Sequence, residues 1–232
     1  MTKPFHVVAV TSLLAAASLS VQAGRPLTTD DAGVVEKGHC EIESFLAHAT
    51  ERDSPSTNGA SFQLGCGVAG NTQVALQLVT ARSGGASARG LAFNGKTALG
   101  EAGAGNALAV GWGLIAAQPD GGTMKYEGAF INGVFTKAVD DAMKLHANLG
   151  WSRSQTAEQS TTNWGVALER TVAEGFDAMG EVFSNDREKS PWVQVGLRWA
   201  VVPEKFFLDT SFGRMTGATR QQQLTVGLKA AF

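Results

Sequence analysis

Charged and amide side chains recur at alternate positions along several segments of this chain. Such side chains do acid–base chemistry, bind ions or line a polar passage. Because they fall at alternate positions, with mostly apolar residues between them, they would share one face of a sheet. Their types fit two roles equally, the lining of a solute route and the hydrated filling of an interior. The predicted set is Glu43, Gln63, Lys96, Glu127, Lys144, His146, Glu169, Glu181, Arg198, Asp209 and Lys229.

His146 is the one histidine of this set, and histidine is the usual general base of enzymes. A catalytic base needs a nucleophile and an orienting carboxylate within reach, and the sequence offers no nucleophile that can be matched to His146. We therefore interpret His146 as part of a charged network and predict no catalytic residue, no cofactor and no enzyme. A barrel enzyme that modifies lipids is the alternative, and a closed structural barrel is a second.

The two cysteines, Cys40 and Cys66, lie 26 positions apart. If two strands pair so that Cys40 faces Cys66, Ile42 faces Leu64 and polar positions face polar ones. This self-consistent register predicts a cross-strand disulfide in an oxidising compartment. Two free thiols are the alternative. No metal site is expected, because thiolate zinc sites usually need four ligands.

Strands must position these side chains, because apolar and polar residues alternate with period two from residue 39 onward. The segment MKLHANLGWS at 143–152 shows the pattern clearly, with Met143, Leu145 and Leu149 on one face. The predicted strands lie near 39–48, 61–69, 72–81, 89–100, 107–117, 124–136, 142–152, 162–172, 176–184, 191–201, 206–214 and 221–232.

The connections between these strands alternate between short turns and longer polar loops, such as AEG at 173–175 and TERDSPSTNGA at 50–60. RSGGASA at 82–88 is expected to be one of the loops. Outer-membrane barrels have this asymmetry, and their strands have about 9–11 residues. We predict an all-β fold, an antiparallel up-and-down transmembrane β-barrel with about twelve strands and both termini in the periplasm. A soluble β-sandwich or a lipocalin-like binder is the alternative.

Aromatic residues are expected at the two membrane interfaces, as in other barrels. The strand directions put Trp151, Trp164 and Trp192 near the outer rim. They put Trp199, Phe176, Phe206 and Phe232 near the inner rim. The last strand can pair with the first and close the sheet. Its terminal Phe232 resembles the signal that bacterial barrel-assembly machinery recognises, so that machinery and outer-membrane lipids are predicted partners.

The first 23 residues are typical of a secretory signal peptide, with Lys3, an apolar core and a small-x-small site that ends at Ala23. A membrane anchor is the alternative, but the apolar run is short for a span. The predicted parts are a signal peptide at 1–23, a periplasmic N-terminal segment at 24–38 and a barrel at 39–232. Because the 232-residue chain has a net charge of −2, no nucleic-acid partner is expected.

The segment GRPLTTDDAGVVEKGHCEIE follows the predicted cleavage site. It resembles the start of a family of bacterial outer-membrane transporters associated with the meta-pathway of phenol degradation. The matching positions include Arg25, Pro26, Asp30, Asp31 and Gly33. The resemblance implies an outer-membrane barrel that passes small solutes by passive diffusion, among them small aromatic or hydrophobic compounds.

Two interpretations of the acidic pair in this segment remain open. Asp30 and Asp31 would form a cation site or a gate contact at the periplasmic mouth in one. In the other, which we favour, Thr29 and Asp30 cap a local turn and Gly33 relieves the bend. In either case the segment is expected to tuck into or across the periplasmic opening.

Overall fold

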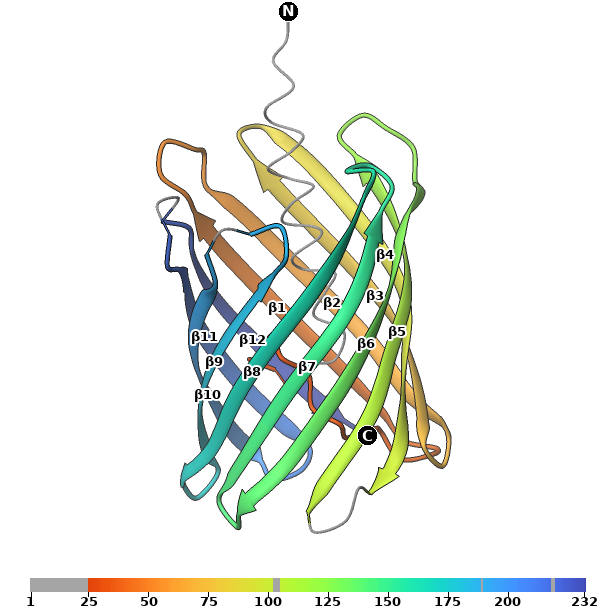
Figure 1. The fold of residues 1–232 in the computed structure, drawn as a ribbon, viewed down its shortest axis with the longest axis vertical. Helices are drawn as coiled ribbons and strands as arrows, with labels where there is room; N and C mark the ends of the chain where they lie inside the picture. Colours follow the sequence, from red (N-terminus) through yellow and green to blue (C-terminus); the bar gives the residue numbers. More distant parts are fainter. Residues whose placement is uncertain (1–24, 102–104, 189, 218–219) are drawn as a thin grey trace, which may run out of the picture.

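The computed structural model describes residues 25–101, 105–188, 190–217 and 220–232. The predicted signal peptide and its cleavage site lie outside these residues. Twelve antiparallel strands form one closed sheet, in which each strand pairs with its chain neighbours and β12 pairs with β1 (Figure 1). The predicted up-and-down barrel is thus confirmed. The strands are β1 Cys40–Thr50, β2 Thr57–Ala69, β3 Thr72–Ser83, β4 Ala86–Glu101, β5 Asn106–Pro119, β6 Lys125–Asp140, β7 Met143–Ser154, β8 Gln159–Ala173, β9 Phe176–Asn185, β10 Trp192–Val202, β11 Phe206–Met215 and β12 Gln222–Ala231.

The two faces of the sheet are inverted relative to a soluble protein. Large apolar side chains stand exposed on the outward face, with Leu46 67% and Leu149 65% accessible. Polar side chains on the inward face are buried, with Gln63 3% and Asn94 0% accessible. Hydrocarbon accepts an apolar exterior without cost, and a closed sheet leaves no unpaired edge in it. The barrel therefore belongs in the bacterial outer membrane, as predicted.

Longer loops join the strands at one end of the barrel and tight turns at the other, and β1 starts and β12 ends at the tight-turn end (Figure 1). One loop prediction was wrong. The stretch 82–88 is not a long loop, because β3 and β4 continue until only Gly84 and Gly85 separate them. Both glycines have positive φ, 57° and 88°, which is the backbone that a two-residue hairpin turn requires.

The seam between β1 and β12 is tied at the tight-turn end. Cys40 and Phe232 exchange two backbone hydrogen bonds of 2.8 and 2.9 Å. On its other side Cys40 pairs with Cys66 in the expected register and is bonded to it in a disulfide. The chain end and the first hairpin therefore close the sheet at the same place.

Aromatic residues occupy both rims of the outward face. Trp151 and Trp164 are exposed toward the loop end, and Trp199 stacks on Phe176 with ring centroids 5.7 Å apart toward the turn end. The assignment of Trp192 to this girdle was wrong. It shares the inward face with buried Gln194, because position along a strand gives depth in the membrane and only the pleat gives the face.

Among the described residues, no helix is long and apolar enough to cross a membrane.

Candidate functional site

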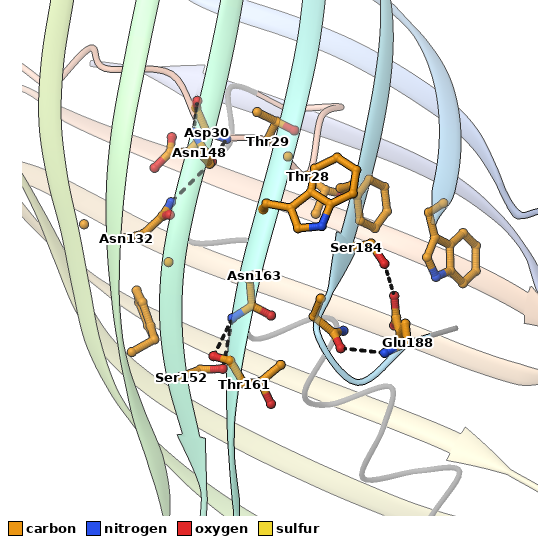
Figure 2. Close-up of a pocket in the computed structure, with 18 of the residues that line it drawn as sticks. Thr28, Thr29, Asp30, Asn132, Asn148, Ser152, Thr161, Asn163, Ser184 and Glu188 are labelled. Atoms are coloured by element: carbon orange, nitrogen blue, oxygen red, sulfur yellow. Dashed lines mark hydrogen bonds between the residues drawn. The ribbon is translucent and has the colours of Figure 1, made fainter. Parts of the chain in front are cut away.

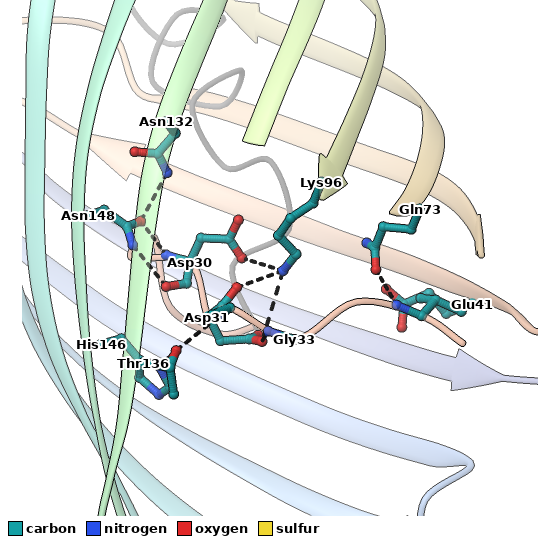
Figure 3. Close-up of polar contacts among 12 residues, drawn as sticks. Asp30, Asp31, Gly33, Glu41, Gln73, Lys96, Asn132, Thr136, His146 and Asn148 are labelled. Atoms are coloured by element: carbon teal, nitrogen blue, oxygen red, sulfur yellow. Dashed lines mark hydrogen bonds and ion pairs between the residues drawn. The ribbon is translucent and has the colours of Figure 1, made fainter. Parts of the chain in front are cut away.

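Residues 25–35 cross the lumen of the barrel, and the exposed residues 36–38 lead from them toward β1 (Figure 3). Starting from Arg25, the segment contacts β11, then β9, then β7 and β4, and finally β3 and β2. In a closed ring of twelve strands β9 and β3 stand opposite each other, so the chain runs from wall to wall. We call residues 25–35 the plug segment.

The plug segment begins with an ion pair. Arg25 donates two hydrogen bonds to the carboxylate of Asp209, 2.7 Å from Nη2 and 3.3 Å from Nε. Its guanidinium lies 4.3 Å from the ring centroid of Phe45, a distance at which cation–π attraction is significant. Arg198 donates to the backbone oxygen of Arg25 from β10. A planar guanidinium matched to a carboxylate holds direction as well as charge.

Glu181 anchors the backbone of the next turn. Its two carboxylate oxygens accept hydrogen bonds from the backbone N–H groups of Thr28 and Thr29, each at 2.7 Å. Gln194 donates both to Glu181 and to the backbone oxygen of Pro26. The carboxylate is therefore buried with donors around it, which is the condition for keeping a charge inside a protein.

Asp30 is buried in the lumen, where side chains of β7 and β4 hold it. Its Oδ1 lies 3.0 Å from the ammonium of Lys96, and both residues are 2% exposed. Asn148 accepts from the backbone N–H of Asp30 and donates to its backbone oxygen, while Asn132 donates to Asn148 (Figure 3). Lys96 also donates to the backbone oxygen of Asp31, 2.7 Å away.

The favoured interpretation of the acidic pair has Asp30 as a turn cap, and the contacts differ from it. The local turn is made one residue later, where the Asp31 carboxylate accepts the backbone N–H of Gly33 at 2.7 Å. Asp30 instead pairs with a lysine 66 positions away. Among the described residues, no group of three or more His, Cys, Asp or Glu side chains is arranged to hold a metal ion.

His146 supports the plug segment through Thr136. Its Nδ1 lies 2.9 Å from the Thr136 hydroxyl, and that hydroxyl accepts the backbone N–H of Ala32. The Glu169 carboxylate lies 3.9 Å from Nε2 of His146. The order Thr136, His146 and Glu169 resembles the nucleophile, base and acid of a catalytic triad. However, His146 is 2% exposed and faces the lumen. A membrane lipid outside the barrel does not reach it.

The other predicted lumen residues separate into two groups. Glu43 and Glu41 share the ammonium of Lys229 at 3.5 and 2.6 Å, and Gln63 is buried beside them on β2. Arg198 lies 3.6 Å from Glu169 and 3.8 Å from Asp177. These groups surround the plug segment.

Lys144 and Glu127 lie outside that network. Lys144 is exposed near the turn end of β7. Glu127 sits at the loop end, at an irregular position of β6 where the pairing with β5 shifts register. Its carboxylate accepts hydrogen bonds from the hydroxyls of Ser154 and Thr156 at 2.6 and 2.5 Å, so it braces the β7–β8 loop.

Inward-facing glycines make room for the plug segment, and the sequence reasoning missed them. A Cβ at Gly196 would lie 2.6 Å from Cγ of Pro26, and one at Gly165 would lie 2.5 Å from Oγ1 of Thr29. A Cβ at Gly227 would collide with the Arg25 guanidinium. These glycines lie on β8, β10 and β12, each at an inward position of its strand. Their shared inward phase is the signal that could have found them.

A cavity of about 360 Å³ lies on the loop side of the plug segment (Figure 2). Thr28, Thr29 and Asp30 form its floor. Its volume falls within the range of ordinary ligand pockets. A second space of about 40 Å³ lies beside Arg25 and Pro26.

The walls of the cavity have different chemistry. Phe45, Ala47, Val79 and Ala81 line it from β1 and β3. Amides and hydroxyls line it from β6, β7 and β8, which stand on the opposite side of the ring; the polar residues there are Asn132, Asn148, Ser152, Thr161 and Asn163. The wall from β6 to β8 is thus the more polar one, although Phe130 of β6 also lines the cavity.

Aromatic rings and one acid border the cavity on β9 and β10. Trp192 stacks on Phe183 with centroids 6.1 Å apart and planes 4° apart, and both line the cavity. Glu188 lies beside them in the β9–β10 loop, where Ser184 donates to it. Burial raises the pKa of the Glu188 carboxyl against that hydrogen bond, so it takes up a proton at a higher pH than an ordinary glutamate.

A family model described as uncharacterised conserved protein UCP029691 matches residues 9–232. The chain belongs to this family. The range matched by the UCP029691 model includes the plug segment together with the barrel. No curated protein matches the chain significantly.

Solved outer-membrane barrels share the fold of this UCP029691 member. The KdgM porin aligns with a TM-score of 0.62 at 11% identity, over 82% of this chain and 99% of that one. The COG4313 outer membrane channel from Pseudomonas putida F1 aligns with a TM-score of 0.62 at 12% identity, over 87% and 98%. The toluene transporter TbuX of Ralstonia pickettii aligns with a TM-score of 0.54 at 8% identity, over 94% of each chain.

These identities show a common fold for the UCP029691 chain and the solved barrels. The predicted resemblance to an outer-membrane barrel family is confirmed at that level. Neither the family model nor the three solved structures link the chain to the meta-pathway of phenol degradation.

Proposed function

We propose that this protein is an outer-membrane channel that passes small solutes by passive diffusion, with the plug segment as its closing element. One observation carries the proposal. Within the described residues, the backbone-to-backbone hydrogen bonds of the N-terminal segment are confined to residues 36–39, where Gly38 pairs with Gly67. The plug segment itself is held through side chains. Its displacement would break ion pairs and side-chain hydrogen bonds but no strand pairing.

The inward side chains have two roles in such a channel: they hold the plug segment, and they line the route once it moves. Asp209, Glu181 and Lys96 hold the plug segment closed through Arg25, Thr28, Thr29 and Asp30. Once it moves, the same side chains would line the route together with Glu43, Gln63, Glu169, Arg198 and Lys229. We further propose that small aromatic or hydrophobic compounds are among the solutes, because Phe45, Phe183 and Trp192 border the cavity.

We further propose how the chain reaches and enters the outer membrane. A signal peptide at 1–23 would direct the chain across the inner membrane, and β12 with its terminal Phe232 would present the chain to the barrel-assembly machinery. Phe232 is 64% exposed, which leaves its ring accessible beside the seam.

Conductance in planar bilayers tests the channel. The mature protein, residues 24–232, is compared with a variant that lacks the plug segment. We expect the variant to conduct more, because its lumen loses the segment that crosses it. Refolding of both is checked by the shift of a folded barrel on unheated gels. If the shortened barrel folds and passes no ions, the protein is a closed structural barrel.

A further inference from the structure

The N–H groups at the floor of the 360 Å³ cavity already donate hydrogen bonds within the protein. The backbone N–H groups of Thr28 and Thr29 donate to Glu181, and that of Asp30 donates to Asn148. The side-chain amide of Asn148 donates to the backbone oxygen of Asp30. The ammonium of Lys96 approaches the floor from the other side, with Asp30 and Asp31 as its acceptors.

Two acceptors at the floor remain without a hydrogen-bond partner among the described residues, Oδ2 of Asp30 and Oγ1 of Thr29. Both residues are 2% exposed and both line the cavity. In Figure 3 one carboxylate oxygen of Asp30 points to Lys96 and the other points away from it. A buried acceptor without a donor destabilises the protein, so a ligand that supplies the donor would recover that loss.

Protonated amines are the donors that suit this floor best. An ammonium has three donors and no acceptor, and it brings a positive charge to a carboxylate that shares one lysine with Asp31. A neutral hydroxyl could donate to Asp30 and accept from the Thr29 hydroxyl, but it brings no positive charge to the carboxylate. Acidic ligands would place two carboxylates together without a new cation.

The walls specify the remainder of the ligand. Phe45, Val79 and Ala81 form an apolar side, and the Phe183–Trp192 pair adds aromatic faces. Aromatic rings also attract cations. We propose that the cavity binds a small amphipathic amine, with its ammonium at Asp30 and Thr29 and its apolar body against the wall above them. This inference rests on the proposed function only in treating the cavity as part of the solute route.

Calorimetric titration of the detergent-solubilised mature protein tests the site, with empty micelles as the blank. Benzylamine at pH 7 is the probe, and benzyl alcohol is its neutral match in ring and length. We expect benzylamine to bind at least about tenfold more tightly, since a hydrogen bond to a charged group contributes about 1.5–3 kcal/mol. Equal binding of the two compounds, or no binding of benzylamine, would overturn the proposal.

Variants locate the ammonium. Asp30→Asn keeps the shape of the side chain, and Thr29→Val keeps the backbone N–H that holds the segment to Glu181. We expect each to weaken benzylamine binding, Asp30→Asn by about tenfold or more. Asp53→Asn is the matched control, because Asp53 lies in the exposed β1–β2 loop with φ 61°, a conformation that asparagine tolerates.

Thr29→Val decides the question if Asp30→Asn does not fold. Unchanged binding in Thr29→Val would then overturn the site. Loss of binding in Glu188→Gln without loss in Thr29→Val would place the amine at the rim and would also overturn it. Binding in detergent does not require conduction, so a barrel that conducts without preferring benzylamine leaves the proposed channel intact. A barrel that binds benzylamine and never conducts contradicts the channel alone.

Discussion

At the residue scale, contact between the plug segment and the wall depends on the absence of side chains as much as on their presence. Gly165, Gly196 and Gly227 let the segment approach the sheet where a Cβ would collide. The contacts that hold it, such as Arg25 with Asp209, are then short and buried. Glycine is costly within a strand, and close approach of another backbone is the physical reason for it here.

Gly196→Val tests this packing. The new side chain would overlap Pro26, whose Cγ lies 2.6 Å from the added Cβ, and overpacking of this kind costs about 1–3 kcal/mol. We expect the plug segment to be displaced and the conductance to rise toward that of the barrel without it. Gly180→Val is the control, since a Cβ at Gly180 would meet nothing within 4 Å. Equal conductance of the two variants would show that Pro26 does not need this space.

At the element scale, the first hairpin both closes the barrel and anchors the plug segment. Strand β1 forms the closing seam with β12 and is disulfide-bonded to β2 at the turn end. The plug segment leads directly into it, since Gly38 pairs with Gly67 next to the disulfide. Movement of the plug segment is therefore limited at its C-terminal end by the disulfide-bonded hairpin.

The double substitution Cys40→Ser with Cys66→Ser tests this tie. The disulfide closes a loop with a sequence separation of 26, and loss of such a cross-link typically costs about 2–4 kcal/mol because the unfolded chain gains freedom. We expect the barrel to convert to its unfolded form on gels at a lower temperature. The wild-type protein heated with a reductant should match the variant. If both keep the midpoint of the untreated protein, the disulfide does not stabilise the barrel.

At the scale of the whole molecule, the lumen and the plug segment together carry more acidic than basic side chains. Among the described residues, the acidic side chains that face the lumen, line its cavity or lie in the segment are Asp30, Asp31, Glu41, Glu43, Glu169, Asp177, Glu181, Glu188 and Asp209. The basic ones are Arg25, Lys96, Lys144, Arg187, Arg198 and Lys229. Carboxylates exceed cations, and a narrow passage between low-dielectric walls focuses the resulting field.

This excess predicts a cation-selective channel. In a potassium chloride gradient, the reversal potential of the open barrel should be shifted toward the equilibrium potential of potassium. The preference should weaken as salt is raised, because the Debye length shortens from about 10 Å at 0.1 M to about 3 Å at 1 M. Glu43→Gln should reduce the preference, and Asp53→Asn in the exposed loop should leave it unchanged. An anion-selective open barrel would contradict this assignment of charges.

Local patterns in the sequence determined the strands, their faces and the first register. Period-two alternation depends only on neighbouring residues, so it located all twelve strands and placed Leu224 and Val226 on the outward face. The like-with-like pairing of Ile42 with Leu64 was enough to align Cys40 with Cys66. Turn geometry was less readable, because the polar stretch around Gly84 and Gly85 has the composition of a loop and the backbone of a hairpin turn.

Only the tertiary structure decided what fills the barrel. Arg25 and Asp209 are separated by 184 positions and Thr29 and Glu181 by 152, and no periodicity links residues so far apart. From the sequence, Asp30 belonged to the N-terminal motif and Lys96 to the lumen face of a strand. Their contact at 3.0 Å exists because the sheet closes around the segment. Closure brings opposite strands within reach of one short stretch of chain, which is a property of the whole ring and of no part of it.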